Sequence, residues 1–81
     1  MNAVALVAHG PDARTRAHAV RVVEAMLFAA AERLPLEVIA ARLPQGVAAA
    51  DILADLSAFY AGRGVNLVAV AGGYAFRTAP D

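Results

Sequence analysis

Apolar side chains recur every three or four residues along the stretch 13–32. This spacing places them on one face of an α-helix. The stripe consists of Val20, Val23, Leu27, Ala30 and Ala31. Asp12 precedes the stripe and is a suitable N-cap, with Thr15 as a second candidate, because their side-chain oxygens can accept bonds from free backbone N–H groups. The pattern therefore predicts a first helix over residues 13–32.

The other side of this helix is also apolar. Residues 25–31 include no polar side chain, and a helix that is apolar all round is buried on more than one side. A chain of 81 residues has a small core of its own. The second apolar side of the helix is therefore most simply buried against another subunit. We therefore expect a dimer or partner interface on the positions off the stripe, although residues 1–8 could instead fold back over them. These positions are Val22, Met26, Phe28 and Ala29.

Two further helices are predicted. The second covers residues 36–43, with Pro35 in its first turn, where a missing N–H costs nothing. Its inward positions are Leu36, Ile39, Ala40 and Leu43. The third covers residues 47–61, and Gly62 and Gly64 end it. Its apolar face is formed by Ile52, Leu53, Leu56, Phe59 and Tyr60.

Two β-prone runs, residues 65–71 and 74–78, flank Gly72-Gly73, which is typical of a two-residue hairpin. With these glycines as the loop, the expected pairs are Ala71 with Tyr74, Ala69 with Phe76 and Leu67 with Thr78. Leu67, Ala69, Tyr74 and Phe76 then share the face that covers the helices. The opposite face carries Val68, Val70, Ala75 and Arg77. Because this second face is more apolar than solvent requires, Val68 and Val70 are further candidates for an interface, unless they are isolated surface valines.

Three helices followed by a two-stranded hairpin is the element order of a winged helix-turn-helix. The predicted fold class is therefore α+β, mostly helical, with the hairpin as the wing and residues 34–36 as a possible third strand. We expect one domain over residues 13–81. Residues 1–12 form an apolar leader, either a strand or a tail, which ends in the turn signal Gly10-Pro11-Asp12.

The sequence gives little support for catalysis or for cofactor binding. The chain lacks cysteine, and its histidines, His9 and His18, form no ligand cluster with nearby carboxylates. Asp51 and Asp55 lie on an outer helix face, with no apolar pocket to raise a pKa. Ser57, the only serine, has no histidine near it in sequence. We expect no enzyme activity, no metal and no cofactor.

Direct binding to nucleic acid is expected to be weak or absent. Seven basic residues balance seven acidic ones, whereas nucleic-acid binders usually carry a basic excess. Arg63 and Arg77 are the best candidates for phosphate contacts, although solvent exposure, or pairing with Glu24 or Asp81, is the favoured interpretation. Asp51 and Asp55 would repel phosphates from the third helix. A winged-helix transcription regulator remains the alternative function.

No stretch approaches 18 consecutive apolar residues, as a membrane span would. The leader has no basic segment before it, so a signal peptide is not expected. A cytoplasmic protein without a membrane partner is the default expectation.

Four blocks of the chain resemble one bacterial family. They are VEAMLFA at 23–29, LPLEVIA at 34–40, YAGRG within 59–65 and VAGGYAFRT at 70–78. The last two are the most specific, because a Gly-Arg-Gly run into a strand and this hairpin are an unusual pairing. Together they resemble the N-terminal winged helix of segregation and condensation protein B, over roughly residues 20–80. The family usually has a small polar residue where Pro35 stands, and a second winged helix after the first.

The resemblance implies a function without catalysis. Members of this family form homodimers through their N-terminal domains. They bind the kleisin subunit, segregation and condensation protein A, which bridges the heads of the chromosomal SMC ATPase. The resemblance therefore implies a cytoplasmic, nucleoid-associated accessory subunit that dimerises, with part of kleisin binding assigned to the second winged helix.

Overall fold

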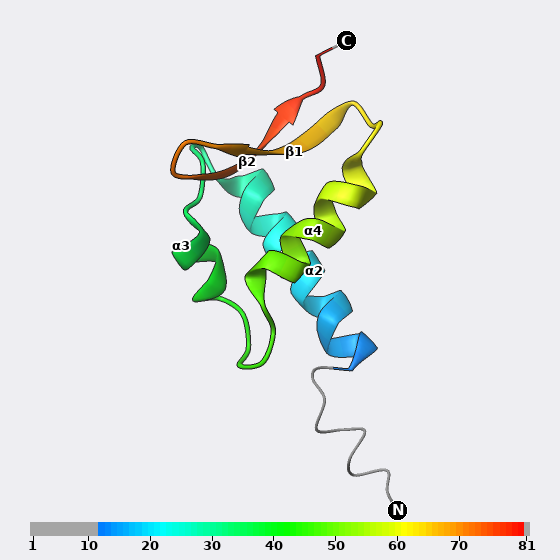
Figure 1. Ribbon diagram of the computed structural model, residues 1–81, viewed down its shortest axis with the longest axis vertical. Helices are drawn as coiled ribbons and strands as arrows, with labels where there is room; N and C mark the ends of the chain where they lie inside the picture. The colour runs from blue at the N-terminus through cyan, green and yellow to red at the C-terminus, as the bar shows by residue number, and fades with distance from the viewer. Residues whose placement is uncertain (1–11, 81) are drawn as a thin grey trace, which may run out of the picture.

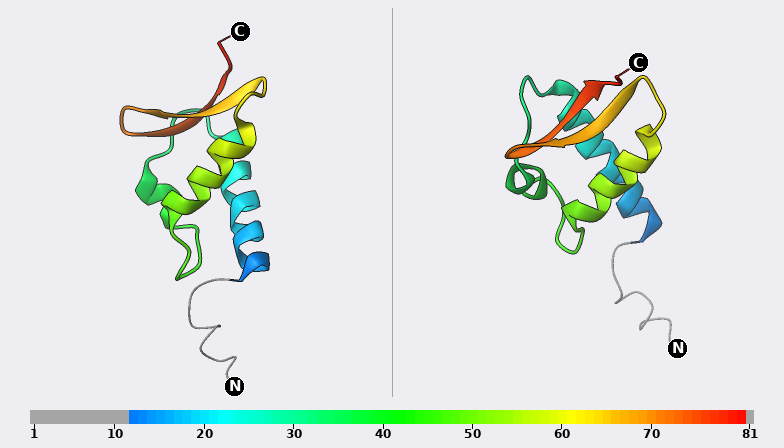
Figure 2. Two further views of the ribbon diagram at one scale, coloured as in Figure 1. Left: turned by 45° about the vertical axis from the view of Figure 1, so that its right-hand side comes forward. Right: turned by 45° about the horizontal axis from the view of Figure 1, so that its top comes forward.

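The computed structural model describes residues 12–80. It contains the helices α2 (Ala13–Ala29), α3 (Leu36–Ala40) and α4 (Ala49–Tyr60), followed by the strands β1 (Val65–Val70) and β2 (Gly73–Thr78). The hairpin lies across one end of the helices (Figures 1 and 2). The expected α+β, winged-helix order of three helices and a wing is confirmed. The leader, expected as a strand or tail, lies outside the described residues except for Asp12, as does Asp81.

Helix α2 begins where the sequence predicts and ends earlier. The Asp12 carboxylate accepts a hydrogen bond of 2.8 Å from the Thr15 N–H, so Asp12 is the N-cap. The helix stops at Ala29 because Ala30 adopts extended backbone, which leads the chain toward the hairpin. Val23 and Leu27 of the predicted stripe are buried, together with Ala19. The prediction is wrong at Ala31, which lies beyond the helix and is exposed.

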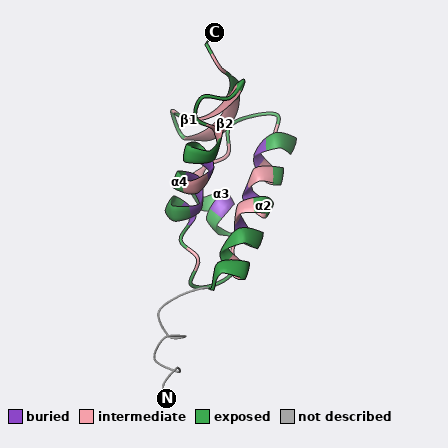
Figure 3. Ribbon diagram, turned by 90° about the vertical axis from the view of Figure 1, so that its right-hand side faces the viewer, coloured by how far each residue is buried: buried purple, intermediate pink, exposed green. Residues whose placement is uncertain are grey.

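The core lies between α2, α3 and α4 (Figure 3). It consists of Ala19, Val23, Leu27, Ile39, Ala49, Ile52, Leu53 and Leu56. Leu34, Leu67, Tyr74 and Phe76 are partly buried against it, so the hairpin covers the helices with the predicted face. The wing therefore closes the core on the side that the three helices leave open.

Three further predicted core positions are wrong. Helix α3 has only five residues, with Pro35 as its N-cap, and this short helix buries Ile39 while Leu36 and Ala40 remain exposed. In α4, Phe59 is 58% exposed. At 3.6 residues per turn Phe59 lies roughly 70° from the centre of the buried stripe of α4, whereas Tyr60 lies close to it.

The hairpin has a different register from the predicted one. Val70 pairs with Gly73 and Ala69 with Tyr74, so the loop is Ala71-Gly72 and not Gly72-Gly73. Gly72 has a φ of 84°, which glycine adopts without strain. The pairs are therefore displaced by two residues. The predicted faces are nevertheless correct, because side chains alternate with a period of two and a shift of two preserves them.

Gly73 is drawn into the strand by the segment between α2 and α3. Leu34 forms an isolated antiparallel bridge with Tyr74, with N···O distances of 2.8 and 2.9 Å. Of the expected third strand, residues 34–36, only Leu34 pairs. A Cβ atom on Gly73 would lie 2.5 Å from the Leu34 carbonyl oxygen. Only glycine therefore lets the two backbones approach this closely.

The Gly73→Ala variant is expected to lose about 1–3 kcal/mol of unfolding free energy, the usual cost of overpacking. The new methyl group meets backbone atoms, which cannot move aside as a flexible side chain would. Gly64→Ala is the matched control, because a Cβ atom there meets nothing within 4 Å. Urea denaturation of both variants tests this, and equal stability would contradict the close approach at Leu34.

Candidate interaction surfaces

Four aromatic rings from three elements form a cluster, called the aromatic patch. They are Phe28 of α2, Phe59 and Tyr60 of α4, and Phe76 of β2. The Phe28 and Phe76 ring centroids are 4.4 Å apart, and those of Tyr60 and Phe76 are 4.8 Å apart. Phe28 is 56% exposed and Phe59 58% exposed. Tyr60 and Phe76 pack against the core and join the patch to it, while Phe28 and Phe59 face solvent.

Two polar contacts fix the patch. The Tyr60 hydroxyl donates a hydrogen bond to the Glu24 carboxylate. This bond raises the pKa of Tyr60, and burial adds to the shift. The Arg63 guanidinium lies 4.4 Å from the Phe59 ring centroid, and its Nε–H donates a bond of 2.8 Å to the Phe59 carbonyl. Phe59 and Tyr60 are therefore held in place although Phe59 is exposed.

The four positions of α2 expected at an interface do not share one surface. At 100° per residue, Val22, Met26 and Ala29 lie on one flank of the buried stripe, and Phe28 lies on the other beside Glu24. Val22 and Met26 are half-buried, and Met26 packs against the core. Only Phe28 and Ala29 are exposed. Of the four, Phe28 is thus the large apolar side chain that faces solvent.

The outer face of the wing is as expected. Val68 and Val70 point away from the helices, together with Ala75 and Arg77, and both valines are half-buried. Arg77 is exposed near one end of this face. The two valines thus offer a small apolar area distinct from the aromatic patch.

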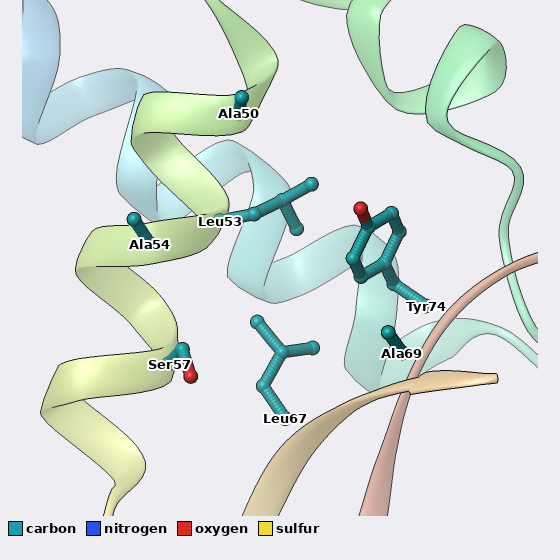
Figure 4. Close-up of a pocket in the computed structure, with 7 residues that line it drawn as sticks. All are labelled: Ala50, Leu53, Ala54, Ser57, Leu67, Ala69 and Tyr74. Carbon is teal, nitrogen blue, oxygen red and sulfur yellow. The ribbon is translucent and has the colours of Figure 1, made fainter.

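An apolar groove of about 260 Å³ lies between α4 and the hairpin. Leu53, Leu67 and Tyr74 point toward one another at its centre (Figure 4). Its remaining lining residues are Ala50, Ala54, Ser57 and Ala69. The sequence does not reveal the groove, because its walls come from elements that only the tertiary fold brings together.

The arginines expected at phosphates lie in different settings. Arg63 is engaged with Phe59, as described above, whereas Arg77 is exposed on the wing. Neither pairs with Glu24, whose carboxylate accepts the Tyr60 hydroxyl.

The exposed face of α4 is poorly suited to reading bases. It presents Ala50, Asp51, Ala54, Ser57 and Ala58. Base edges are read by arginine, lysine, asparagine or glutamine, and this face carries none of them. The helix that would enter the major groove is thus neutral to acidic.

Asp55 belongs to an ion pair that joins α4 to α2. Arg16 of α2 donates two hydrogen bonds to its carboxylate, of 2.8 and 3.0 Å. These hydrogen bonds lower the pKa of Asp55, and the charge of Arg16 adds to the effect. Its folded-state pKa is therefore below its unfolded value. The resulting stabilisation is present above the unfolded pKa and is lost as the pH falls through the folded pKa.

We expect the Asp55 carboxyl to titrate below its ordinary value of 3.8. In the Arg16→Gln variant the midpoint should rise toward 3.8, because the neutral amide cannot supply the charge-assisted bonds. Carbon-detected NMR titration measures this midpoint. Arg14→Gln, a neighbouring exposed position, is the control and should leave it unchanged. An Asp55 midpoint that does not respond to Arg16→Gln would rule out the pair in solution.

Within residues 12–80, no helix is both long and apolar enough to cross a membrane.

The family of the segregation and condensation complex subunit ScpB matches residues 21–81. Comparison with curated proteins and comparison with solved structures gave no match. The matched residues include α3, α4, the whole hairpin and the α2 segment that carries Phe28, and they extend over well more than half of the chain. The chain therefore belongs to the ScpB family.

Proposed function

We propose that this chain is a non-catalytic, dimerising accessory subunit of the bacterial SMC–kleisin complex. Family membership gives the coarser statement, which is an SMC-associated segregation and condensation subunit. The proposal adds a homodimer and a contact with the kleisin, segregation and condensation protein A, and through it with the SMC ATPase. It also places the protein in the cytoplasm, at the nucleoid.

The observation that carries the proposal is the aromatic patch. Phe28 and Phe59 are each more than half exposed, although aromatic side chains gain more than most others from burial. A contiguous apolar patch with a polar edge is typical of a protein interface. Here Glu24 and Arg63 supply that edge. Phe28 and Phe59 are therefore assigned to the contact with the second copy.

The other expected contacts remain part of the proposal. Val22, Met26 and Ala29 flank the core stripe of α2, and Val68 and Val70 lie on the outer face of the wing. They are assigned to the dimer or to the partner, on surfaces separate from the aromatic patch.

A non-catalytic role is supported by the surroundings of the polar side chains. Among the described residues, Asp55 is bound by Arg16 and Glu24 by Tyr60. Ser57 makes no hydrogen bond to a histidine within this part of the chain. Within residues 12–80, the hydrogen bonds thus bring together no nucleophile and base of the kind that acyl transfer requires.

The alternative, a winged-helix transcription regulator, is not favoured. Its recognition helix would be α4, which presents alanines and Asp51 to solvent. Binding to duplex DNA would also show a steep dependence on salt concentration. The proposal instead expects little binding of duplex DNA at physiological salt.

Light scattering after size exclusion tests the proposal. The chain is measured alone and mixed with the kleisin from the same organism. A dimer that moves into a larger complex with the kleisin supports both parts. A monomer that forms no complex would overturn the proposal, and a dimer that binds duplex DNA in place of the kleisin would favour the regulator.

A further inference from the structure

The hydrogen bonds of the Tyr74 backbone show in which direction the N–H and C=O groups of the hairpin point. Its N–H donates to the Leu34 carbonyl and its carbonyl accepts from the Leu34 N–H, at 2.9 and 2.8 Å. Both groups therefore point away from β1. Since Tyr74 lies opposite Ala69, these two residues form a non-hydrogen-bonded pair of the antiparallel ladder.

Such pairs alternate along the ladder with hydrogen-bonded ones. Leu67 opposite Phe76 and Val65 opposite Thr78 are therefore non-hydrogen-bonded pairs as well. The N–H and C=O groups of Val65, Leu67 and Ala69 thus point outward, along the edge of β1 that pairs with no other strand among the described residues. No backbone group within residues 12–80 bonds to them. An edge of this kind is a template for an added extended strand.

The apolar groove lies beside this edge. Leu67 and Ala69, whose backbone groups are free, also place their side chains in the groove. On the facing wall of α4, Leu53 is flanked by three small side chains, those of Ala50, Ala54 and Ser57. A strand added to β1 would direct every second side chain to the same face as Leu67 and Ala69. Those side chains would enter the space that the small residues of α4 leave open.

The chemistry of the site defines what fits. Neither the lining of the groove nor β1 contains a charged side chain. A charged side chain that entered the groove would lose its hydration without gaining a partner of opposite charge. The bound segment must therefore be extended in its backbone and uncharged and apolar at every second position.

We infer that the free edge of β1 and the adjoining groove bind an extended, uncharged, apolar segment of the partner polypeptide as an added strand. This inference rests on the proposed function, because it takes the kleisin as the source of that segment. The second copy occupies the aromatic patch in the proposed dimer, which leaves the edge of β1 for a different chain. Main-chain hydrogen bonds supply the affinity, and the groove supplies the selection for apolar side chains.

Proline at position 69 tests the strand edge. The N–H of Ala69 points outward, so Ala69→Pro removes a donor from the edge and none from the hairpin ladder, and proline is tolerated at such edge positions. The control is Ala71→Pro, at the first position of the loop, because the positive φ of the following Gly72 is that of a type II turn, in which proline is common at the first position. Titration calorimetry with the purified kleisin should show about tenfold weaker binding for Ala69→Pro, and wild-type affinity for Ala71→Pro.

Hydrogen exchange distinguishes a kleisin segment bound as an added strand from a non-specific loss of affinity in the Ala69→Pro variant. In the free chain the amides of Leu67 and Ala69 should exchange quickly, whereas those of Val68 and Val70 are protected by the ladder. Adding the kleisin should slow the exchange of Leu67 and Ala69 in particular. Unchanged exchange at these two amides in the complex would overturn the inference, even where affinity falls in Ala69→Pro.

The groove is tested by filling it. Ala54→Phe places a ring in the groove from an exposed position, and Ala58→Phe adds the same ring to α4 outside it. Only Ala54→Phe should weaken kleisin binding.

If the unsubstituted chain does not bind the kleisin, the proposed function fails and this inference with it. If it binds, and Ala69→Pro and Ala54→Phe bind equally well, the inference alone fails. A change of the oligomeric state in Ala69→Pro would assign the edge to the second copy and overturn it too.

Discussion

The Phe28→Asp variant is expected to be a monomer at concentrations where the unsubstituted chain is a dimer. Phe28 is the largest exposed side chain of α2 and lies against Phe76 and Tyr60, so a partner surface would meet a rigid aromatic platform. Buried aromatic anchors at interface centres cost about 2 kcal/mol or more when removed, roughly a thirtyfold loss of affinity. A buried, unpaired carboxylate adds to that cost.

Light scattering measures the molar mass, and circular dichroism checks the helical content. The substitution also removes a stacking contact within the chain, which is worth about 1 kcal/mol. Phe59→Asp is therefore a second variant, because Phe59 is equally exposed and its ring does not stack on Phe76 but lies beside Tyr60 and Arg63. Val38→Asp, on the exposed side of α3, is the control and should remain a dimer. A dimeric Phe28→Asp variant with native helical content would remove the aromatic patch from the dimer interface.

The sequence predicts the order of the elements well because each has a local signal. Asp12 is the N-cap that its position predicts, and Val23 and Leu27 are buried at helical spacing. The two faces of the hairpin are also correct, because they depend on alternation alone. Local periodicity is therefore enough to specify what is helix, what is strand and which side of the hairpin faces inward.

The predictions are wrong where contacts between residues distant in sequence determine the structure. The register of the hairpin depends on the bridge between Leu34 and Tyr74, which holds Gly73 within the strand. No pattern within residues 65–78 contains that information. The early end of α2 has a related origin, since the chain must leave the helix for Leu34 to reach β2. A sequence of alternating residues accepts either register, and the neighbouring segment selects one.

The candidate site was predictable only in part. The apolar far side of the first predicted helix pointed to Phe28, which is exposed. Val22 and Met26 share its apolar character, but helical geometry places them on another flank of α2. The groove and the free edge of β1 have no signal in the sequence, because both arise from the way the hairpin crosses α4. The sequence thus predicts that Phe28 is exposed, but it does not predict the surface around Phe28.

Helix α4 offers the sharpest test of the core. Leu56 and Phe59 are three residues apart and were both expected to face inward, yet Leu56 is 1% exposed and Phe59 58% exposed. Replacing Leu56 with alanine is expected to cost about 3 kcal/mol, because it removes buried methylene groups and leaves a cavity between α2, α3 and α4. A chain of this size has roughly 4–12 kcal/mol of unfolding free energy. The Leu56→Ala variant should therefore lose a large part of its stability and unfold at a clearly lower urea concentration.

Phe59→Ala is the matched control on the same helix. Although it removes more atoms, most of the ring is already in water, and the loss of its contacts with Tyr60 and Arg63 should cost about 1 kcal/mol. Both variants are compared by urea denaturation below the dimer dissociation constant, so that dissociation of subunits does not enter the measured free energy. If Phe59→Ala proves as costly as Leu56→Ala, Phe59 belongs to the core after all. The patch would then lose one of its two exposed rings, and the case for a dimer would rest on Phe28 alone.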